Sequence, residues 1–163
     1  MTAQTDFAPL QLCVLTVSDT RTLENDSSGD YLAGALQAAG HQLHARALLP
    51  DDRYRLRALV SAWIAEPAVD GILVTGGTGF TGRDSTPEAL LPLLDKEMPG
   101  FGELFRAISV DEIGTSSLQS RAFAGVANAT FLFALPGSTS ACRPAWEKIV
   151  VHQLAARTRP CQL

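Results

Sequence analysis

Short apolar runs alternate with amphipathic segments along the chain. Residues 11–17 (QLCVLTV), 69–75 (VDGILVT) and 130–135 (TFLFAL) are rich in β-branched and aromatic side chains, which is typical of strands buried on both faces. Residues 41–49 alternate between two faces until the turn at Pro50 breaks the pattern. Four strands are therefore predicted.

Apolar residues at helical spacing occupy most of the remaining chain. The clearest helix ends before Pro67 and places five apolar side chains on one face: Leu56, Leu59, Val60, Trp63 and Ile64. Further helices are predicted at residues 27–39, with Ser27 as N-cap and Gly40 as the stop, at 101–108 and at 140–156. Another is predicted at 85–95, behind a capping box of Ser85 and Glu88 or, alternatively, with Thr86 as the cap and Pro87 in the first turn. Residues 114–128 show no clear pattern.

Strand and helix alternate without an internal repeat or a linker. This order predicts one α/β domain over residues 1–163, a three-layer α/β/α fold with a mostly parallel sheet, preceded by a flexible N-terminal arm at residues 1–9. A chain of this length buries roughly 70% of its unfolded surface, so it needs no metal or disulfide to complete a core. Ligands of such sheets bind at the carboxyl ends of the strands.

The charge and the cysteines narrow the functional class. A net charge of −4 lacks the broad basic surface of proteins that wrap nucleic acid or coat anionic membranes. Cys13, Cys142 and Cys161 lie far apart without a C-x-x-C spacing, which favours neither a disulfide framework nor a zinc site. The first residues lack a basic region before their apolar run, and no apolar run nears the ~20 residues of a membrane span. A cytoplasmic protein with a small ligand is predicted.

A polar or glycine-rich loop follows each predicted strand, at residues 16–20, 50–52, 75–84 and 136–139. Each loop alone is typical of a routine strand-to-helix turn, but all four would share one edge of the sheet. Ser18 is a candidate ligand-binding residue in the first loop, although its hydroxyl could instead close a local turn. The last loop contributes three candidates, Pro136, Gly137 and Ser138, and Ser138 could instead cap the final helix.

The central loop has the sequence TGGTGFTGRDSTPEA at residues 75–89. Its glycines permit positive φ, so consecutive backbone N–H groups can converge on a phosphate. The candidate binding residues here are Thr75, Gly76, Gly77, Thr78 and Gly79, together with Arg83. A Rossmann site is disfavoured because the G-x-G-x-x-G run does not lead directly into a helix, and a Walker loop is excluded because no Gly-Lys-Ser/Thr follows.

Two carboxylates, Asp51 and Asp84, end separate loops at this edge. Carboxylates beside a phosphate nest make electrostatic sense when a divalent cation intervenes, and Mg²⁺ takes one or two carboxylates plus phosphate oxygens. They are therefore candidate catalytic residues and candidate ligands of Mg²⁺ carried by ATP. The alternative is that Asp51 caps the helix of Arg-bearing residues 53–57 and Asp84 caps the helix near Ser85.

Nearly the whole chain resembles the molybdenum cofactor biosynthesis proteins of the MoaB/Mog type. The segments that carry the resemblance are VLTVSDTR, LLPDDRYRLRALVSAWIA, TGGTG followed by Arg-Asp-x-Thr-Pro-Glu, LPGSTSACRPAWEKIV, and SLQSRAFAGVAN and ARTRPC, which favour the B branch of the family. The resemblance implies a molybdopterin-binding fold, a trimer or dimer of trimers, and adenylylation of molybdopterin by Mg-ATP with release of pyrophosphate. By position it makes Asp51 and Asp84 the essential carboxylates and residues 75–79 the pterin-phosphate or nucleotide loop.

The expected ligands are therefore molybdopterin, as substrate, and ATP with Mg²⁺, and other proteins of the pathway are expected partners. Two alternatives stay open at this point. One is a molybdopterin-binding or carrier protein without catalysis, which would show no magnesium-dependent nucleotide binding. The other is a mononucleotide-binding module unrelated to pterins, which would not bind molybdopterin. The presence of Asp51, Arg83 and Asp84 together favours an enzyme.

Overall fold

The computed structural model describes residues 7–155, and within this range a six-stranded sheet forms the middle of the molecule. Its strands are β1 (Gln11–Val17), β2 (Gln42–Leu49), β3 (Gly71–Thr75), β4 (Lys96–Glu97), β5 (Phe123–Ala127) and β6 (Thr130–Leu135), in the order β2-β1-β3-β6-β5-β4. β2, β1, β3 and β6 pair in parallel, whereas β5 pairs antiparallel with both β6 and β4. The predicted, mostly parallel sheet is confirmed.

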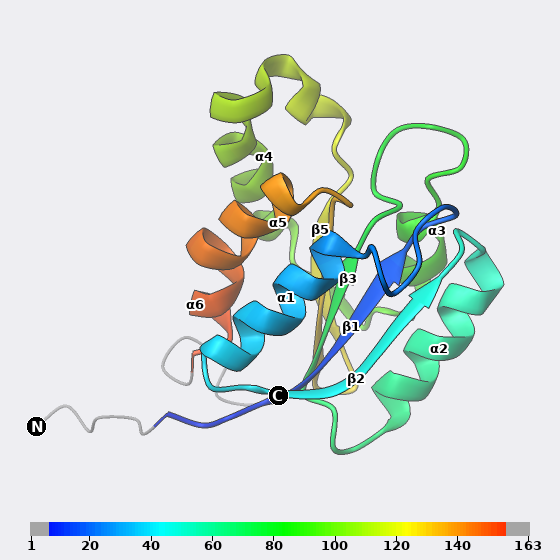
Figure 1. The fold of residues 1–163 in the computed structure, drawn as a ribbon, viewed down its shortest axis with the longest axis vertical. Helices are drawn as coiled ribbons and strands as arrows, with labels where there is room; N and C mark the ends of the chain where they lie inside the picture. The colour runs from blue at the N-terminus through cyan, green and yellow to red at the C-terminus, as the bar shows by residue number, and fades with distance from the viewer. Residues whose placement is uncertain (1–6, 156–163) are drawn as a thin grey trace, which may run out of the picture.

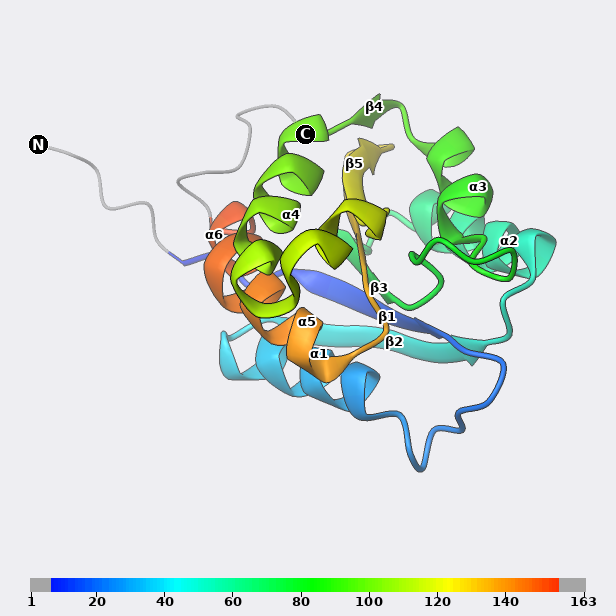
Figure 2. The same ribbon diagram turned by 90° about the horizontal axis from the view of Figure 1, so that it is seen from above.

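Helices cover both faces of the sheet, as Figures 1 and 2 show. One layer holds α1 (Ser27–Ala38), α4 (Pro99–Ile113), α5 (Thr139–Ala145), the π-helical turn η3 (Trp146–Val150) and α6 (Val151–Gln153). The other holds α2 (Arg53–Ala65) and α3 (Thr86–Leu90), and two 3₁₀ turns, η1 (Leu91–Leu93) and η2 (Gly114–Gln119), complete the set. The three-layer α/β/α architecture is therefore confirmed.

The alternation of side chains along each strand divides the interior into two cores. On β1, Leu12 and Val14 pack with α1, α4 and α5, whereas Cys13 and Leu15 pack with α2 and α3. All four side chains are fully buried, as expected for a parallel strand covered on both faces. Because both faces are used for packing, the strand ends and the loops that follow them are left to bind a ligand.

The caps predicted for two helices are wrong, although α1 begins at Ser27 as predicted. Asp26, rather than Ser27, caps α1, because the Asp26 carboxylate accepts the N–H of Gly29 at 3.1 Å. The capping box at the start of α3 does not form, because the Ser85 hydroxyl donates to Asp51 and Glu88 pairs with Arg121.

The helix predicted to reach residue 95 ends at Leu90, followed by η1. Pro92 has no N–H to continue the helix, and Arg57 donates instead to the carbonyls of Glu88 and Ala89, at 2.8 and 2.9 Å. The last helix is divided at η3, which begins two residues after Pro144. Its predicted end at residue 156 lies outside the described residues, as do residues 1–6 of the predicted N-terminal arm.

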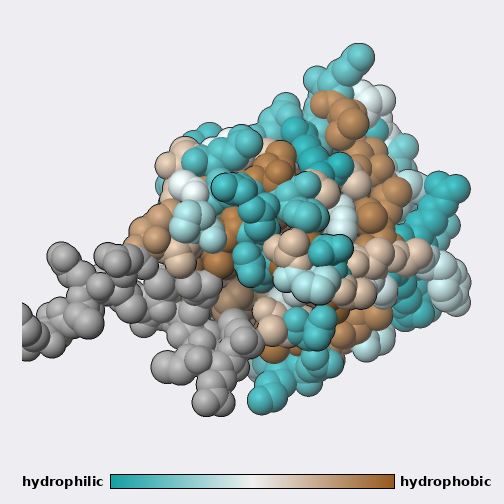
Figure 3. Space-filling model, turned by 90° about the horizontal axis from the view of Figure 1, so that it is seen from below, coloured by the Kyte–Doolittle hydropathy of each residue, from teal (hydrophilic) through white to brown (hydrophobic). Residues whose placement is uncertain are grey.

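No helix among residues 7–155 is both long and apolar enough to cross a bilayer. Seen from below, hydrophilic and hydrophobic residues are interspersed over the surface (Figure 3). β4, β5 and η2 lie where the sequence pattern predicted no element, and β5 and β4 form the antiparallel edge of the sheet.

Candidate functional site

The four strand-end loops meet at one edge of the sheet. In the register of the sheet Thr16 lies beside Thr75, and Thr75 beside Leu135, so β1, β3 and β6 end at the same level. Val17 likewise lies beside Leu49 of β2. The chain passes from β1 to one side of the sheet and from β3 to the other, which makes the space between their ends the switch point where ligands of open α/β sheets bind.

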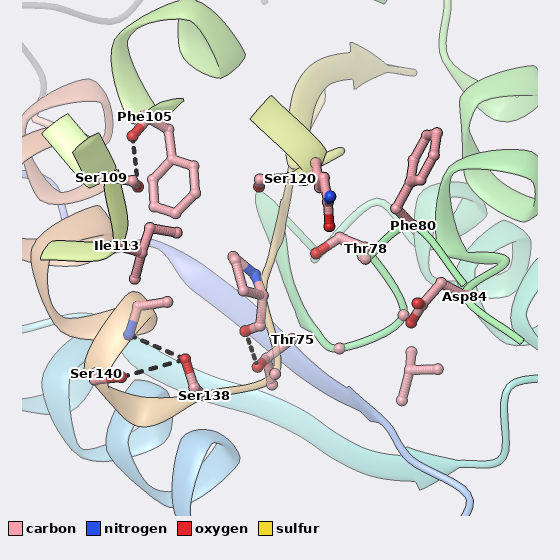
Figure 4. Close-up of a pocket in the computed structure, with 18 of the residues that line it drawn as sticks. Thr75, Thr78, Phe80, Asp84, Phe105, Ser109, Ile113, Ser120, Ser138 and Ser140 are labelled. Atoms are coloured by element: carbon pink, nitrogen blue, oxygen red, sulfur yellow. Dashed lines mark hydrogen bonds between the residues drawn. The ribbon is translucent and has the colours of Figure 1, made fainter. Parts of the chain in front are cut away.

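A cavity of about 620 Å³ lies at this edge. The predicted site residues that line it are Ser18, Thr75, Gly76, Gly77, Thr78, Gly79, Asp84, Pro136, Gly137 and Ser138. Asp51 and Arg83 are not among the lining residues. Figure 4 shows the labelled side chains on two opposite walls, with Thr78, Phe80 and Asp84 on one and Phe105, Ser109 and Ile113 on the other.

The first wall is the glycine loop, residues 76–84. Gly76 and Gly77 have φ values of 106° and 69°, and a Cβ on Gly76 would lie 2.2 Å from the carbonyl oxygen of Val17. Only glycine fits there without strain. Among the described residues, no acceptor takes a hydrogen bond from the N–H groups of residues 77–80. A run of unpaired N–H groups of this kind is an anion-binding arrangement.

Thr75, at the end of β3, and Arg21 hold the 136–138 loop in place at the edge of the sheet. The buried Thr75 hydroxyl donates to the carbonyl of Pro136 at 2.8 Å and lies 3.1 Å from the Ser28 hydroxyl. Arg21 donates to the carbonyl of Gly137 and to Ser28, both at 3.1 Å. Arg21 is the one cationic side chain among the lining residues, and the sequence pattern did not single it out.

The two local alternatives for Ser18 and Ser138 are both present. Ser18 accepts the N–H groups of Thr20 and Arg21 at 3.2 and 3.0 Å, which is the local turn. Ser138 caps α5 by accepting the N–H of Ala141 at 3.3 Å. Both residues nevertheless line the cavity, so the turn and the cap position hydroxyls at its edge.

Asp84 lies within the glycine loop rather than at a helix start. Its Oδ2 accepts the N–H of Thr81 at 3.0 Å and the Thr81 hydroxyl at 2.7 Å. A Cβ on Gly79 would lie 2.6 Å from the same oxygen, so the missing side chain of Gly79 leaves room for this carboxylate. Asp84 therefore faces the cavity and does not cap α3.

Asp51 lies behind the glycine loop. It accepts the N–H of Ser85 at 3.2 Å and also the Ser85 hydroxyl, and a Cβ on Gly77 would lie 3.1 Å from its Oδ2. The capping of α2 belongs to Asp52, whose carboxylate accepts the N–H groups of Tyr54 and Arg55. Asp51 is thus free of the capping role and is fixed to the start of α3 instead.

Arg83 pairs with Asp19 instead of facing the cavity. Its Nη2 and Nε donate to Asp19 Oδ2 at 2.7 and 3.0 Å, and Asp19 Oδ1 accepts the N–H of Asp51 at 3.0 Å. The hydrogen bond from Arg83, and then that from Asp51, lower the pKa of Asp19 below its ordinary value. Asp19 therefore connects three strand-end loops through one exposed carboxylate.

Arg121 holds the glycine loop from the other side. Its guanidinium donates to the carbonyls of Gly79 and Asp84, at 2.8 and 2.6 Å, and pairs with Glu88, while its backbone N–H donates to Thr78 at 2.8 Å. The hydrogen bond from Arg121 lowers the pKa of Glu88. No sequence pattern pointed to this role, although Arg121 lies in the SLQSRAFAGVAN segment that favoured the B branch.

The second wall comes from α4 and η2. Phe105, Ser109, Glu112, Ile113 and Ser116 line the cavity at a spacing that places them on one side of the helix and its continuation. The predicted helix at residues 101–108 covered only the start of this wall. Ser109, Glu112 and Ile113 fell beyond the predicted end of that helix, and Ser116 fell in the segment without a clear pattern, so most of the wall was not predicted from the sequence.

Residues 7–155 support neither a metal site built from protein side chains alone nor catalysis by the Cys142 thiol. No group of three or more His, Cys, Asp or Glu side chains is arranged there to hold a metal ion by protein ligands alone. Burial raises the pKa of the Cys142 thiol to about 11, and Cys142 contacts Thr75 beneath the cavity. Cys142 is therefore a protonated packing residue at neutral pH and not a nucleophile.

The family model described as a probable molybdopterin binding domain matches residues 13–156 of the chain. The chain belongs to this molybdopterin-binding family. It is 58% identical over 157 residues to molybdenum cofactor biosynthesis protein B of Escherichia coli K12, covering 96% of this chain and 92% of that protein. It is 43% identical over 143 residues to the protein of the same name from Bacillus subtilis, covering 87% and 84% of the two chains.

A crystal structure of a molybdenum cofactor biosynthesis protein B superposes on this molybdopterin-binding domain with a TM-score of 0.87. The two share 42% sequence identity over 90% of this chain and 92% of the other. The resemblance to MoaB/Mog-type proteins that the motifs indicated is thereby confirmed, together with their fold.

Proposed function

We propose that the protein binds molybdopterin in the 620 Å³ cavity and adenylylates it with Mg-ATP, releasing pyrophosphate. The observation that carries the proposal is that an anion-binding loop and a carboxylate, Asp84, line the same cavity. A carrier of phosphorylated ligands needs only the loop, whereas transfer between two phosphates also needs compensation of charge at the reacting phosphorus. The family description and the names of the relatives support molybdopterin as one of the two ligands.

The residues present fit a magnesium ion that arrives with ATP. Mg²⁺ binds through one or two carboxylates and completes its shell with phosphate oxygens and water, so a protein cage is unnecessary. Asp84 would hold it at the glycine loop, and Asp51, against Gly77, is the second carboxylate of the predicted pair. The ion, when bound, neutralises charge on the phosphates and polarises the α-phosphorus.

In the proposed reaction the terminal phosphate of molybdopterin attacks the α-phosphorus of ATP. A new phosphorus–oxygen bond forms while the bond between the α-phosphorus and the bridging oxygen breaks, and pyrophosphate leaves. The N–H groups of residues 77–80 bind phosphate oxygens and hold the reacting groups in line. Arg21 adds a positive charge at the 136–138 side of the same cavity.

The test is turnover of molybdopterin and Mg-ATP by the purified protein, measured as pyrophosphate and as adenylylated product. We expect Asp84→Asn to lower the rate by about 100-fold or more, a typical loss when a preorganised electrostatic group is removed. Asp52→Asn is the matched control, because asparagine caps a helix about as well as aspartate and Asp52 caps α2 outside the cavity. Undiminished turnover by Asp84→Asn would refute the role of Asp84.

A second candidate function is molybdopterin binding or carriage without catalysis. The observation that favours it is that Asp51 is engaged by Ser85 and lies outside the lining of the cavity. Calorimetric titration with Mg-ATP separates the two functions. A carrier takes up no nucleotide with or without magnesium, whereas the proposed transferase binds ATP more tightly when magnesium is present.

A further inference from the structure

The two walls of the cavity offer opposite hydrogen-bonding chemistry. The glycine loop presents backbone N–H donors, and Arg21 adds cationic N–H donors at the 136–138 loop. The α4–η2 wall presents the hydroxyls of Ser109 and Ser116 and the carboxylate of Glu112, next to the apolar Phe105 and Ile113. A ligand with phosphate at one end and a flat, hydrogen-bonding heterocycle at the other matches this polarity.

Glu112 is the acceptor-only group of the α4–η2 wall. It lines the cavity together with Ser109 and Ile113, and its position three residues after Ser109 places it on the same side of α4 as Ser109. Among residues 7–155 it forms no ion pair and no side-chain hydrogen bond. Asp84, the other carboxylate of the cavity, is already held by Thr81 inside the glycine loop. Glu112 is therefore the carboxylate available to a heterocycle.

We propose that Glu112 selects the pterin by accepting two hydrogen bonds from its 2-amino-4-oxopyrimidine ring. That ring presents the N3–H and the 2-amino group side by side, and a carboxylate accepts two such parallel bonds. Adenine presents an amino group beside a ring nitrogen lone pair, which a carboxylate repels. In this arrangement the pterin lies against the α4–η2 wall and the phosphates bind the glycine loop. This assignment rests on the molybdopterin binding proposed above, but not on adenylyl transfer.

The test compares two ligands with the same ring system and the same 6-substituent, 6-hydroxymethylpterin and 6-hydroxymethyllumazine, which differ in the group on C2 and in the proton on N1. Lumazine carries a carbonyl where the pterin carries its 2-amino group, so it turns an acceptor toward Glu112. Binding is followed by quenching of the ligand's own fluorescence, without ATP. We expect the wild-type protein to prefer the pterin by about 10- to 100-fold, the usual range for a hydrogen bond to a charged group.

Glu112→Gln supplies the decisive comparison. A carboxamide offers one acceptor and one donor, which pairs with the N3–H and carbonyl of lumazine, so the preference should vanish or reverse. Asp111→Asn removes the same charge from the neighbouring residue, which does not line the cavity, and should retain the preference of the wild type. Both positions are exposed, so neither change disturbs the core.

Three results would overturn the assignment: equal affinity of the wild-type protein for the two ligands, binding of neither, or the same loss of preference in Asp111→Asn. A wild-type protein that prefers the pterin but transfers no adenylyl group would refute the proposed reaction and leave the assignment standing. Adenylyl transfer combined with an unchanged preference in Glu112→Gln would support the proposed reaction and refute the role of Glu112.

Discussion

The glycine-loop wall of the cavity follows parallel strands whose ends are aligned in register, whereas the α4–η2 wall is the connection between the antiparallel strands β4 and β5. The first wall is held mainly by backbone geometry, through positive φ at Gly76 and Gly77. The second presents side chains from one helix and the turn that continues it. A wall of backbone N–H groups suits phosphate, which is common to many ligands, whereas a wall of side chains can distinguish one heterocycle from another.

The largest effect is expected where the backbone of the first wall is changed. In Gly76→Ala the new Cβ would meet the Val17 carbonyl at 2.2 Å and the residue would keep a φ of 106°. Strain of this kind and the forced shift of β1 should lower the free energy of unfolding by about 2–4 kcal/mol. Urea unfolding measures it.

Gly82→Ala is the control for this prediction. Gly82 lies in the same loop without a positive φ, and a Cβ added there would meet nothing within 4 Å. A gain or loss of about 1 kcal/mol or less is expected there. Equal losses in the two variants would show that the loop tolerates no side chain anywhere, and that the geometry of Gly76 is not special.

Arg121 holds the glycine loop through two of its carbonyls, and its loss should reduce turnover without unfolding the protein. Arg121→Ala releases the carbonyls of Gly79 and Asp84, so the loop can shift relative to the reacting phosphates. A displacement of about 1 Å costs up to about 100-fold in rate, and we expect a 10- to 100-fold fall in kcat. Steady-state kinetics of pyrophosphate release provide the measurement.

Glu88→Gln separates the two functions of Arg121. It weakens the ion pair but leaves both carbonyl hydrogen bonds in place. We expect less than about a threefold change, because an isolated, partly exposed ion pair contributes little. If Glu88→Gln reproduced the fall in kcat of Arg121→Ala, the ion pair with Glu88, and not the hydrogen bonds to the two loop carbonyls, would be responsible for the effect.

The same contrast explains which parts of the molecule the sequence could predict. β1, β3 and β6 appear as unbroken apolar runs, and the glycines of the loop and Gly40 are local signals for positive φ. β4 has only two residues and forms because it pairs with β5, some 28 positions later. No local pattern in the sequence predicts this pairing. The hydrogen bonds of Arg121 are likewise tertiary.

The sequence also could not show which of two neighbouring residues of the same type has which role. Judged from the local pattern, Asp51 and Asp52 are equally good helix caps. Only the folded chain shows that Asp52 caps α2 and that Asp51 accepts hydrogen bonds from Ser85. Arg83 looked like a phosphate ligand because it follows the glycines, yet Asp19, 64 positions away, takes its guanidinium. The type of chemistry could be predicted at this edge, but not the partner of each side chain.

A smaller effect is expected at Arg21, which adds the charge that the backbone wall lacks. Arg21→Ala should weaken the binding of inorganic pyrophosphate by about 10-fold, the loss of one charge-assisted hydrogen bond. Calorimetric titration measures it, and Arg55→Ala on the exposed side of α2 controls for the change in net charge. Equal weakening in both variants would mean that pyrophosphate responds to overall charge rather than to Arg21.

The smallest effect concerns the exposed pair of Asp19 and Arg83. The pKa of Asp19 lies below its ordinary value of 3.8, chiefly because Arg83 donates to it. A carboxyl whose pKa is lowered on folding stabilises the folded state above its ordinary pKa, and this contribution is lost as the pH falls through the lowered value. In Arg83→Gln, NMR titration of the Asp19 carboxyl carbon should give a pKa closer to 3.8, though still below it, because the N–H of Asp51 continues to donate. An unchanged pKa would show that Arg83 does not hold Asp19 in solution, and the link between the glycine loop and the first strand-end loop would then depend on the backbone alone.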